Sequence, residues 1–443
     1  MHKHIQWLLG QIPDLIDRQV IDEQTAVQLK SHFEPQLLKR GSSPVFLITS
    51  LLGAVLIGAG VISLFAYNWE HLSRTTKTIL SFLPMIVAMG IFSYGFVRKK
   101  DSLAWRESSA GFLMLMVGAC ISLIAQTYHI GGTMTDFLRN WMLLSIPLIY
   151  LTNSTLCAVF YMAGTTAWLL SLQSLWGKSE GAEIYYWLFL LAVLPHIWIN
   201  LKQQTSRMRS TILGWGLGIA LCISVPFLVE SNWDGKIFWA YSLLFSLLYI
   251  AGRYFYAAAE HAWQKPFQFL AVGGIFITSM ILAEGNWEYL MPEGLAEIIG
   301  RGDRAFFGYV ANSILGGIVV LFLLIAHWRF PRHGLRLNLF ISLFPLLFVI
   351  STASLLGTGD VLPMILMNVY LLALGIYFLW DGIKKEKLGL VNTGMLFISS
   401  LLVMRFFDAN LGFVVKGIVF ILIGAGFIAV NMYLSKKRNL SHA

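Results

Sequence analysis

The sequence predicts an all-α, polytopic membrane protein: a helix bundle of about 14 transmembrane helices with both termini in the cytoplasm. Three observations predict this class. Hydrophobic residues make up 57% of the 443 residues, charged residues make up only 12%, and the mean hydropathy is +0.69. A soluble chain carries about 25% charged residues. The charges are also clustered, which leaves uncharged stretches of roughly 20 residues, the length that a helix needs to cross the hydrocarbon core.

Residues 1–43 form a polar segment ahead of the first apolar run. Apolar residues recur at helical spacing in its first half, where Pro13 interrupts the pattern. Asp22 can cap a second helix, and Pro35 would end that helix. We therefore expect a cytosolic helical pair. It either packs as a solvated tail on the membrane body or binds a cytosolic partner through residues 1–40. Charges occur throughout the segment, so it does not resemble a signal peptide.

Fourteen apolar runs follow, and each is a candidate span. They cover residues 44–67, 76–97, 108–128, 138–152, 155–173, 184–200, 210–229, 236–252, 266–284, 305–328, 337–355, 361–380, 388–405 and 411–434. The pair within 138–173 is short, so it either spans twice or forms a re-entrant pair, which would leave about 12 spans. We expect an N-terminal membrane unit at 44–173, a C-terminal membrane unit at 184–435, and a basic cytosolic tail at 436–443.

Basic residues orient these spans. Cytoplasmic loops of membrane proteins carry an excess of Lys and Arg. With the N-terminus in the cytoplasm, most of the 32 Lys and Arg residues fall on the inner side, either in the N-terminal tail or in loops that follow inward-running spans. Examples are Arg98 and Lys99 after the second run and Lys384 and Lys385 after the twelfth. Both termini are therefore expected inside.

The net charge of +9 does not indicate a nucleic-acid-binding protein, because the basic residues lie in short loops without a long basic stripe. Cys120, Cys157 and Cys222 lie inside apolar runs and are expected to be small buried hydrophobes, not disulfide partners. No CxxC or HExxH pattern is present. The sequence therefore predicts neither a metal nor another cofactor.

One polar step, Asn-Trp-acid, occurs directly after three of the apolar runs. Its tryptophans and acids are Trp69 and Glu70, Trp233 and Asp234, and Trp287 and Glu288. All three copies lie on the outer side in the predicted topology. Tryptophan is enriched at membrane interfaces, so the steps are either plain interface anchors or the wall of a polar outer pocket. In such a pocket the rings would stack on a sugar or lipid headgroup, and the acids would accept hydrogen bonds.

Four other polar residues are candidates for the same outer-face binding site. Gln126 and His129 follow the third run, and Arg405 and Asp408 end the thirteenth. Arg405 can bind a phosphate through a bidentate pair of hydrogen bonds. Alternatively it pairs with Asp408, three residues further along the same helix.

No acidic residue lies at the middle of a span, which argues against a carrier coupled to protons or sodium. His196 and Asn368 are the polar candidates within spans, either as hydrogen-bonded packing residues or as ligand groups. Outer carboxylates can also do acid–base work on a lipid-linked glycan. No nucleophile elbow, phosphate-binding loop or Asp-rich metal motif occurs, so no catalytic residue is assigned.

Three segments resemble a bacterial family of predicted multi-pass membrane proteins of unknown function, over roughly residues 1–150. They are the N-terminal helical pair, the run LLGAVLIGAGVISLFAYNWEHLSR, and the step LIAQTYHIGG with a following NW. A later segment, RFFDANLGFVVKGIVFILIGAGFIAVN, looks like a second uncharacterised membrane domain. The resemblance implies a bacterial inner-membrane location. It implies no known activity, so it assigns no site residue.

Three functions remain open. The first is transporter-like binding or movement of a lipid or an envelope-glycan precursor through the outer-facing pocket. The second is a non-catalytic assembly or sensor role, with the helical pair as the cytosolic contact. The third is a membrane enzyme that acts on a lipid-linked substrate. Transport predicts a polar path between Gln126, His196 and Asn368, catalysis predicts two converging outer acids, and assembly predicts neither.

Overall fold

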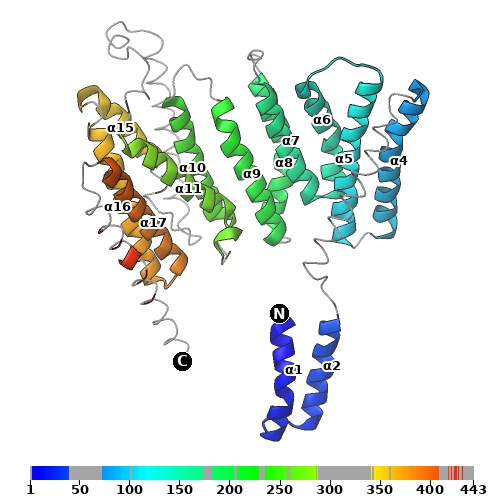
Figure 1. Ribbon diagram of the computed structural model, residues 1–443, viewed down its shortest axis with the longest axis horizontal. Helices are drawn as coiled ribbons and strands as arrows, with labels where there is room; N and C mark the ends of the chain where they lie inside the picture. Colours follow the sequence, from blue (N-terminus) through cyan, green and yellow to red (C-terminus); the bar gives the residue numbers. More distant parts are fainter. Residues whose placement is uncertain are drawn as a thin grey trace. The chain divides into compact units, whose positions relative to one another are not determined.

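Every regular element that the computed structural model describes is a helix (Figure 1). The described residues are 2–38, 72–99, 102–172, 182–203, 207–228, 235–256, 259, 261–285, 287, 341, 344–358, 361–408 and a few positions beyond 408. The predicted spans 44–67 and 305–328 lie outside them, as does most of 411–434. The chain divides into two compact units, Met1–Leu80 and Ser81–Ala443.

The first unit contains the predicted helical pair, α1 (His2–Asp17) and α2 (Glu23–Leu38), which pack against each other (Figure 1). Ile12 and Ala26 are buried. The helices pair because packing them together removes apolar side chains of both, such as Ile12 and Ala26, from water.

The start of α2 is predicted correctly and its end is not. The Asp22 carboxylate accepts a hydrogen bond from the backbone N–H of Thr25 at 3.2 Å, so Asp22 caps α2. Helix α2 nevertheless continues through Pro35 to Leu38, and α1 runs through Pro13. The expectation that Pro35 ends its helix was therefore wrong. A proline removes one backbone hydrogen bond, and the other bonds of both helices carry them past it.

The second unit begins with a series of antiparallel helices. They are α4 (Arg74–Arg98, whose residues up to Leu80 belong to the other unit), α5 (Leu103–Thr127), α6 (Met134–Thr152), α7 (Thr155–Leu172), α8 (Ala182–Gln203) and α9 (Arg207–Leu228). Helix α7 packs on α5, α6, α8 and α9 and is the centre of this group. Helices α6 and α7 are 19 and 18 residues long, or about 28 Å each. Of the two, α7 is among the helices long and apolar enough to cross a membrane and α6 is not, so two crossings and a re-entrant pair both stay predictions.

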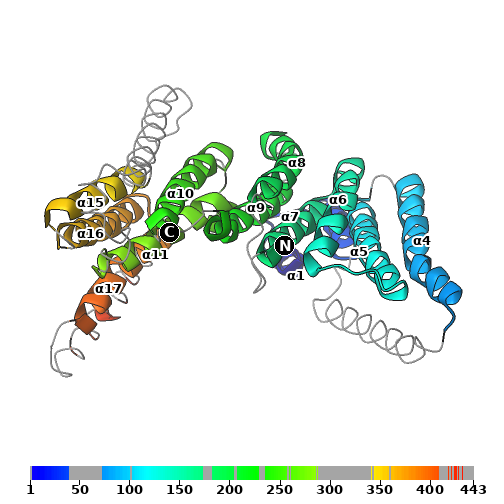
Figure 2. The ribbon, with the colours of Figure 1, turned by 90° about the horizontal axis from the view of Figure 1, so that it is seen from above.

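The second unit continues with a further group of helices. They are α10 (Gly235–Phe255), the short η2 (Ala262–Gln264), α11 (Pro266–Ala283), α15 (Phe344–Thr358), α16 (Val361–Lys384) and α17 (Leu388–Asp408). Helix α10 packs on α11, α11 on α16, and α16 on α17. Figure 2 shows α10, α11, α15, α16 and α17 together, and α9 joins them to the first group through contacts with α10 and α11.

Eight described helices are long and apolar enough to cross a membrane, and the protein is therefore a multi-pass membrane protein. They are α4, α5, α7, α9, α10, α11, α16 and α17. Large apolar side chains on their surfaces are exposed, for example Ile86 at 59% and Ile277 at 59%. Such surfaces are stable in contact with lipid and costly in water.

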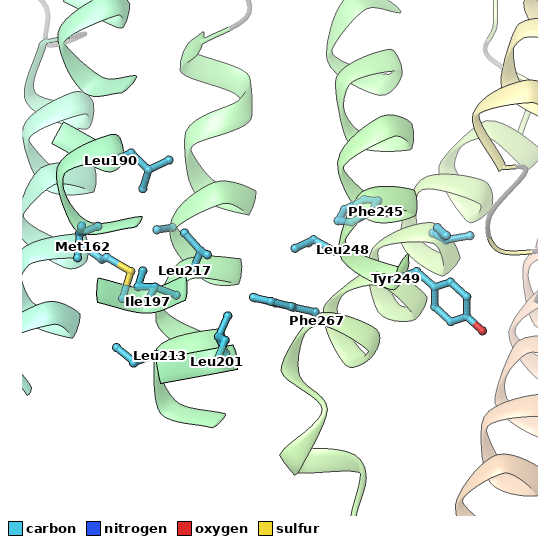
Figure 3. Close-up of a cluster of buried hydrophobic side chains, with 14 of the residues drawn as sticks. Met162, Leu190, Ile197, Leu201, Leu213, Leu217, Phe245, Leu248, Tyr249 and Phe267 are labelled. Atoms are coloured by element: carbon cyan, nitrogen blue, oxygen red, sulfur yellow. The ribbon is translucent and has the colours of Figure 1, made fainter. Parts of the chain in front are cut away.

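The core of the second unit is a continuous cluster of buried apolar side chains. Figure 3 shows part of this cluster, in which Met162 of α7 and Leu190 of α8 lie near Leu217 of α9. Helices α16 and α17 approach so closely that glycine is required at their contact. A Cβ atom on Gly382 would lie 2.6 Å from the backbone nitrogen of Val391. Small residues of this kind let helices pack tightly in lipid.

Candidate functional site: an apolar groove and two polar clusters

An apolar groove of about 740 Å³ lies between α8, α9 and α10, with one wall completed by α11. Leu191 and Trp198 of α8 line it, as do Leu217 of α9, Leu247 of α10 and Phe267 of α11. Every residue of the lining is apolar or aromatic. The volume lies within the roughly 300–1,000 Å³ typical of small-molecule sites.

The groove opens on an exposed apolar surface of the second unit. The side chains of Leu191, Trp198 and Leu247 are 56%, 53% and 46% exposed. Lining residues of α8 recur from Trp187 to Leu201, which is one stripe along the helix. At 1.5 Å per residue this stripe is about 21 Å long. It is longer than half of the hydrocarbon core, about 15 Å, so the groove can follow an acyl chain through one leaflet.

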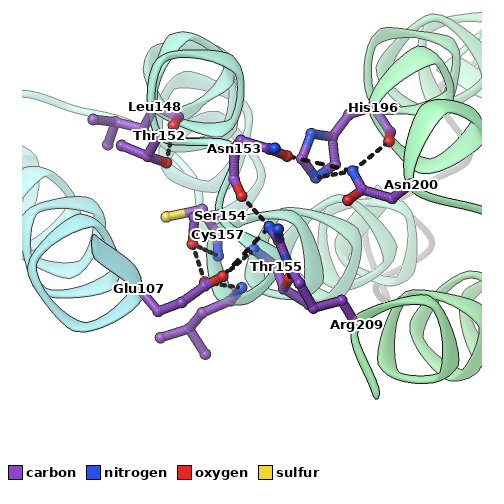
Figure 4. Close-up of polar contacts among 11 residues, drawn as sticks. Glu107, Leu148, Thr152, Asn153, Ser154, Thr155, Cys157, His196, Asn200 and Arg209 are labelled. Atoms are coloured by element: carbon purple, nitrogen blue, oxygen red, sulfur yellow. Dashed lines mark hydrogen bonds and ion pairs between the residues drawn. The ribbon is translucent and has the colours of Figure 1, made fainter. Parts of the chain in front are cut away.

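A polar cluster joins the helix ends on the predicted inner side (Figure 4). Its centre is Glu107 in the second turn of α5. The Glu107 carboxylate accepts hydrogen bonds from the backbone N–H of Thr155 at 3.0 Å and of Leu156 at 2.9 Å, and from the Ser154 hydroxyl. Glu107 therefore caps the N-terminus of α7, where unpaired N–H groups and the helix dipole favour a negative charge.

Arg209, near the start of α9, is the partner of Glu107. Its Nη2 lies 3.6 Å from Oε1 of Glu107, and its Nε donates to Oγ1 of Thr155 at 2.8 Å. It also donates to the Asn153 carbonyl. The two charged side chains are only 11% and 19% exposed. The ion pair thus ties α5, the α6–α7 turn and α9 together.

The inner cluster extends to α8 through Asn200. The Asn200 amide donates to the His196 carbonyl at 2.8 Å and to Oδ1 of Asn153 at 3.4 Å. The Ser210 hydroxyl donates to the Asn200 carbonyl at 3.1 Å, and the Tyr256 hydroxyl donates to the Ser210 carbonyl at 2.6 Å. The Ser210–Asn200 bond fastens α8 to α9, and the Tyr256–Ser210 bond fastens the end of α10 to α9. These bonds connect the three helices that form the groove. Since the charged groups are engaged by each other and by backbone, the cluster fits a structural tie better than a ligand site.

A second polar cluster lies at the opposite, predicted outer ends of α11, α16 and α17. Nε of Arg405 donates to Oδ1 of Asn368 at 2.9 Å, and its Nη2 donates to the Ala283 carbonyl. Asn368 also donates to the carbonyls of Ala283 at 3.1 Å and Met364 at 2.7 Å. Arg405 thus places a positive charge at the C-terminal end of α11, where the helix dipole favours it.

The outer-face residues predicted from sequence are placed only in part. Five of them lie outside the described residues: Trp69, Glu70, Trp233, Asp234 and Glu288. The side chain of Asp408 also lies outside, so its pairing with Arg405 stays a prediction. Gln126 and His129 are exposed at the end of α5.

Trp287 is fully buried. Its indole N–H donates to the Leu282 carbonyl at 2.8 Å, and its ring centroid lies 5.9 Å from that of Phe348. Trp287 therefore offers no exposed ring face. Its indole N–H and the Arg405 guanidinium donate to adjacent carbonyls, those of Leu282 and Ala283, at the C-terminal end of α11. His196 and Asn368 belong to clusters at opposite ends of the helices.

Sequence reasoning did not single out Glu107, Arg209 or the groove. A signal existed for the ion pair, because Glu107 and Arg209 each stand directly before an apolar run, 108–128 and 210–229. A charge at the start of a span is also common in a plain cytoplasmic loop. The sequence positions of Glu107 and Arg209 therefore did not show whether their charges are buried as a pair or solvated separately.

The capping box at the start of α6 should make the stability of the protein depend on pH. Thr133 and Asp136 form a reciprocal capping box, with the Thr133 N–H donating to Asp136 at 3.1 Å and the Asp136 N–H donating to Thr133 at 3.2 Å. The hydrogen bonds from the Thr133 backbone and side chain lower the pKa of Asp136 below its ordinary 3.8. The cap therefore stabilises the fold above about pH 4, and this contribution is lost as pH falls through the lowered pKa.

We expect Asp136→Ala to cost about 1 kcal/mol near neutral pH, where the cap is intact. The melting temperatures of the wild type and of Asp136→Ala should differ at pH 7, and the difference should shrink as pH falls below about 4 towards the lowered pKa of Asp136. Thermal unfolding in detergent at a series of pH values measures this difference. A gap between the two proteins that stays constant over this range would contradict the assignment.

Residues 13–158 match the model of a family described as "Predicted membrane protein (DUF2157)". The matched segment runs from α1 into the first turn of α7, which confirms the resemblance to an uncharacterised family of membrane proteins over this part of the chain. No curated protein and no solved structure matches the chain. The groove helices α8, α9 and α10 lie beyond the matched segment.

Proposed function

We propose that this multi-pass membrane protein, whose N-terminal third is shared with an uncharacterised membrane protein family, binds a bilayer lipid in the manner of a transporter. In the proposal an acyl chain lies in the groove between α8, α9 and α10. The observation that carries it is the wholly apolar lining of a groove whose side chains are exposed at the surface. A sugar or a nucleotide would lose hydrogen bonds to water in such a lining, whereas an acyl chain loses none.

The second half of the proposal is movement of that lipid, or of an envelope-glycan precursor, towards an outer polar pocket. It is supported by the position of Arg405, whose guanidinium bonds Asn368 and the Ala283 carbonyl near the predicted outer face. The basic residues of the inner loops support both termini in the cytoplasm. We infer a bacterial inner-membrane location from the resemblance of the N-terminal segments.

Filling the groove tests the proposal. Leu191→Trp combined with Leu247→Trp places two large side chains in the groove from opposite walls. Leu188→Trp is the matched control, because Leu188 is also 56% exposed on α8 and does not line the groove. Native mass spectrometry after purification in mild detergent counts retained lipid. We expect the wild type and the control to keep a discrete lipid, and the groove variant to lose at least nine-tenths of it. Equal retention in all three would contradict the proposal.

A non-catalytic assembly or sensor role is the second candidate. Helices α1 and α2 pack on each other, and Val20 in the turn between them and Val27 of α2 are 64% and 65% exposed. This candidate assigns these two side chains to the contact with a cytosolic partner. Under this candidate, cells that carry the variant Val20→Ser with Val27→Ser should behave like cells without the protein. The purified variant should retain as much lipid as the wild type.

A further inference from the structure

The two ends of the apolar groove differ in their depth along the helices. At one end the groove reaches Phe255, the last residue of α10, and Phe267, the second residue of α11. The apolar span of α10 ends at Phe255 and that of α11 begins at Pro266, so this end of the groove lies at a membrane boundary. In the predicted topology it is the inner boundary.

The groove stops well short of the opposite, predicted outer ends of its helices. On α10 the outermost lining residue is Leu244, the tenth residue of that helix, and on α8 it is Trp187, the sixth. At 1.5 Å per residue, these positions lie about 14 Å and about 8 Å from the outer ends of their helices. The wall that α10 provides, from Leu244 to Phe255, is about 17 Å long, close to the roughly 15 Å of hydrocarbon in one leaflet.

Two tyrosine hydroxyls fasten the walls of the groove directly beyond its outer end. Tyr186 of α8 and Ser224 of α9 share a hydrogen bond of 2.5 Å between their hydroxyls. The Tyr241 hydroxyl of α10 donates to the Cys222 carbonyl of α9 at 2.9 Å. Each tyrosine stands within one helical turn of the outermost lining residue of its own helix. Both walls are therefore tied to α9 at the level where the groove ends.

An aromatic pair stands at the inner end of the groove. The rings of Trp198 of α8 and Phe255 of α10 contact each other edge to face, with 5.4 Å between their centroids. Both residues line the groove. Tryptophan is typical of the depth at which lipid headgroups meet the hydrocarbon. The inner tie through Asn200 does not end the groove, because the next residue, Leu201, still lines it.

We propose that the groove takes its lipid from the cytoplasmic leaflet and holds it with the headgroup at the Phe255 end and the chain ends towards Trp187. This inference rests on the proposed function, since it assigns a leaflet and an orientation to the same lipid. A headgroup at the inner end stays in contact with water, whereas one at the level of Leu244 would lose its hydrogen bonds to water inside an apolar lining. A chain of the outer leaflet reaches about 15 Å into the membrane, so it ends where the α10 wall begins.

The test uses the full-length protein in vesicles and two phosphatidylcholine probes that differ only in the position of a diazirine. One probe carries the diazirine next to the ester of an acyl chain, and the other carries it next to the terminal methyl. Illumination with and without an excess of unlabelled lipid, followed by mapping of labelled peptides, identifies the displaceable labels. Leu191→Trp with Leu247→Trp fills the groove, and Leu188→Trp is its matched control outside the lining.

The ester probe should label the inner lining, at Trp198 and Phe255, at least threefold more than the outer lining, at Trp187 and Leu244. The terminal probe should show the opposite preference, and the groove variant, unlike its control, should lose the displaceable labels of both probes. A reversed pattern, or the same pattern for both probes, would overturn the orientation and leave the proposed function standing. If the lining carries no displaceable label in the wild type, or keeps it in the groove variant, the proposed function fails as well.

Discussion

Replacing Glu107 by alanine is expected to lower the free energy of unfolding by about 3–5 kcal/mol. The change leaves the Arg209 guanidinium buried without its counter-charge, and it removes the cap from the first N–H groups of α7. Both effects act where α5, α7 and α9 meet. Thermal or denaturant unfolding in detergent, followed by tryptophan fluorescence, measures the loss.

The exposed pair Asp14 and Arg18 provides the control. Its side chains are 50% and 71% exposed, and its geometry is closer, at 3.0 Å. Asp14→Ala should nevertheless lower the free energy of unfolding by no more than about 0.5 kcal/mol, because water screens exposed pairs.

A double variant tests whether Glu107 and Arg209 act as a pair. Glu107→Gln combined with Arg209→Met should lower the free energy of unfolding by clearly less than the sum of the two single changes. Additive costs would show that the two side chains do not act as a buried pair.

The second large effect is expected at Gly394 of α17. A Cβ atom there would lie 2.5 Å from the backbone nitrogen of Leu379 and 2.6 Å from the carbonyl oxygen of Gly375. Backbone atoms of α16 cannot move aside as a flexible side chain can, so the two helices must separate. We expect Gly394→Ala to lower the free energy of unfolding by about 1–3 kcal/mol, and Gly394→Leu by more.

Gly389, on the same helix, is the matched control for Gly394. A Cβ atom on Gly389 would meet nothing within 4 Å. Gly389→Ala should therefore leave stability unchanged or raise it by up to about 1 kcal/mol, because alanine favours a helix more than glycine does. Unfolding curves of the two alanine variants compare the two positions directly. A similar shift in both would show that the α16–α17 contact is not the cause.

The sequence was sufficient for those features that depend on local composition. Uncharged apolar runs predict helices because a backbone in lipid must bond to itself, and each described run is helical. The cap at Asp22 was also predictable, since a cap needs only its own next turn. Pro35 was a misleading signal, because the cost of one missing hydrogen bond is smaller than the gain from continuing the helix.

The candidate site was less predictable, because it depends on which helices become neighbours. Glu107 and Arg209 are 102 positions apart and meet only through the packing of α5, α7 and α9. Arg405 was singled out, but its bonds to Asn368 and Ala283 come from two other helices. The groove carries no sequence signal at all, since the apolar stripe of α8 has the same composition as any lipid-facing stripe.

Helix α8 connects the inner polar cluster with the apolar groove. Asn200 fastens this helix to α9 on one side, and Leu191 and Trp198 line the groove on the other. Loss of the inner cluster should therefore loosen the groove walls as well as the fold. A destabilised Glu107→Ala protein that still retains lipid as the wild type does would separate the two roles.

The most direct test of a lipid-filled groove is photo-crosslinking in reconstituted vesicles. A phosphatidylglycerol with a diazirine near the middle of one acyl chain is illuminated, and labelled peptides are mapped by mass spectrometry. A bound lipid predicts labels concentrated on α8 and α10, at the level of Leu191 and Leu247, and displaced by an excess of unlabelled lipid. Labels spread evenly over the lipid-facing helices, α4 included, and insensitive to competitor would contradict a specific site.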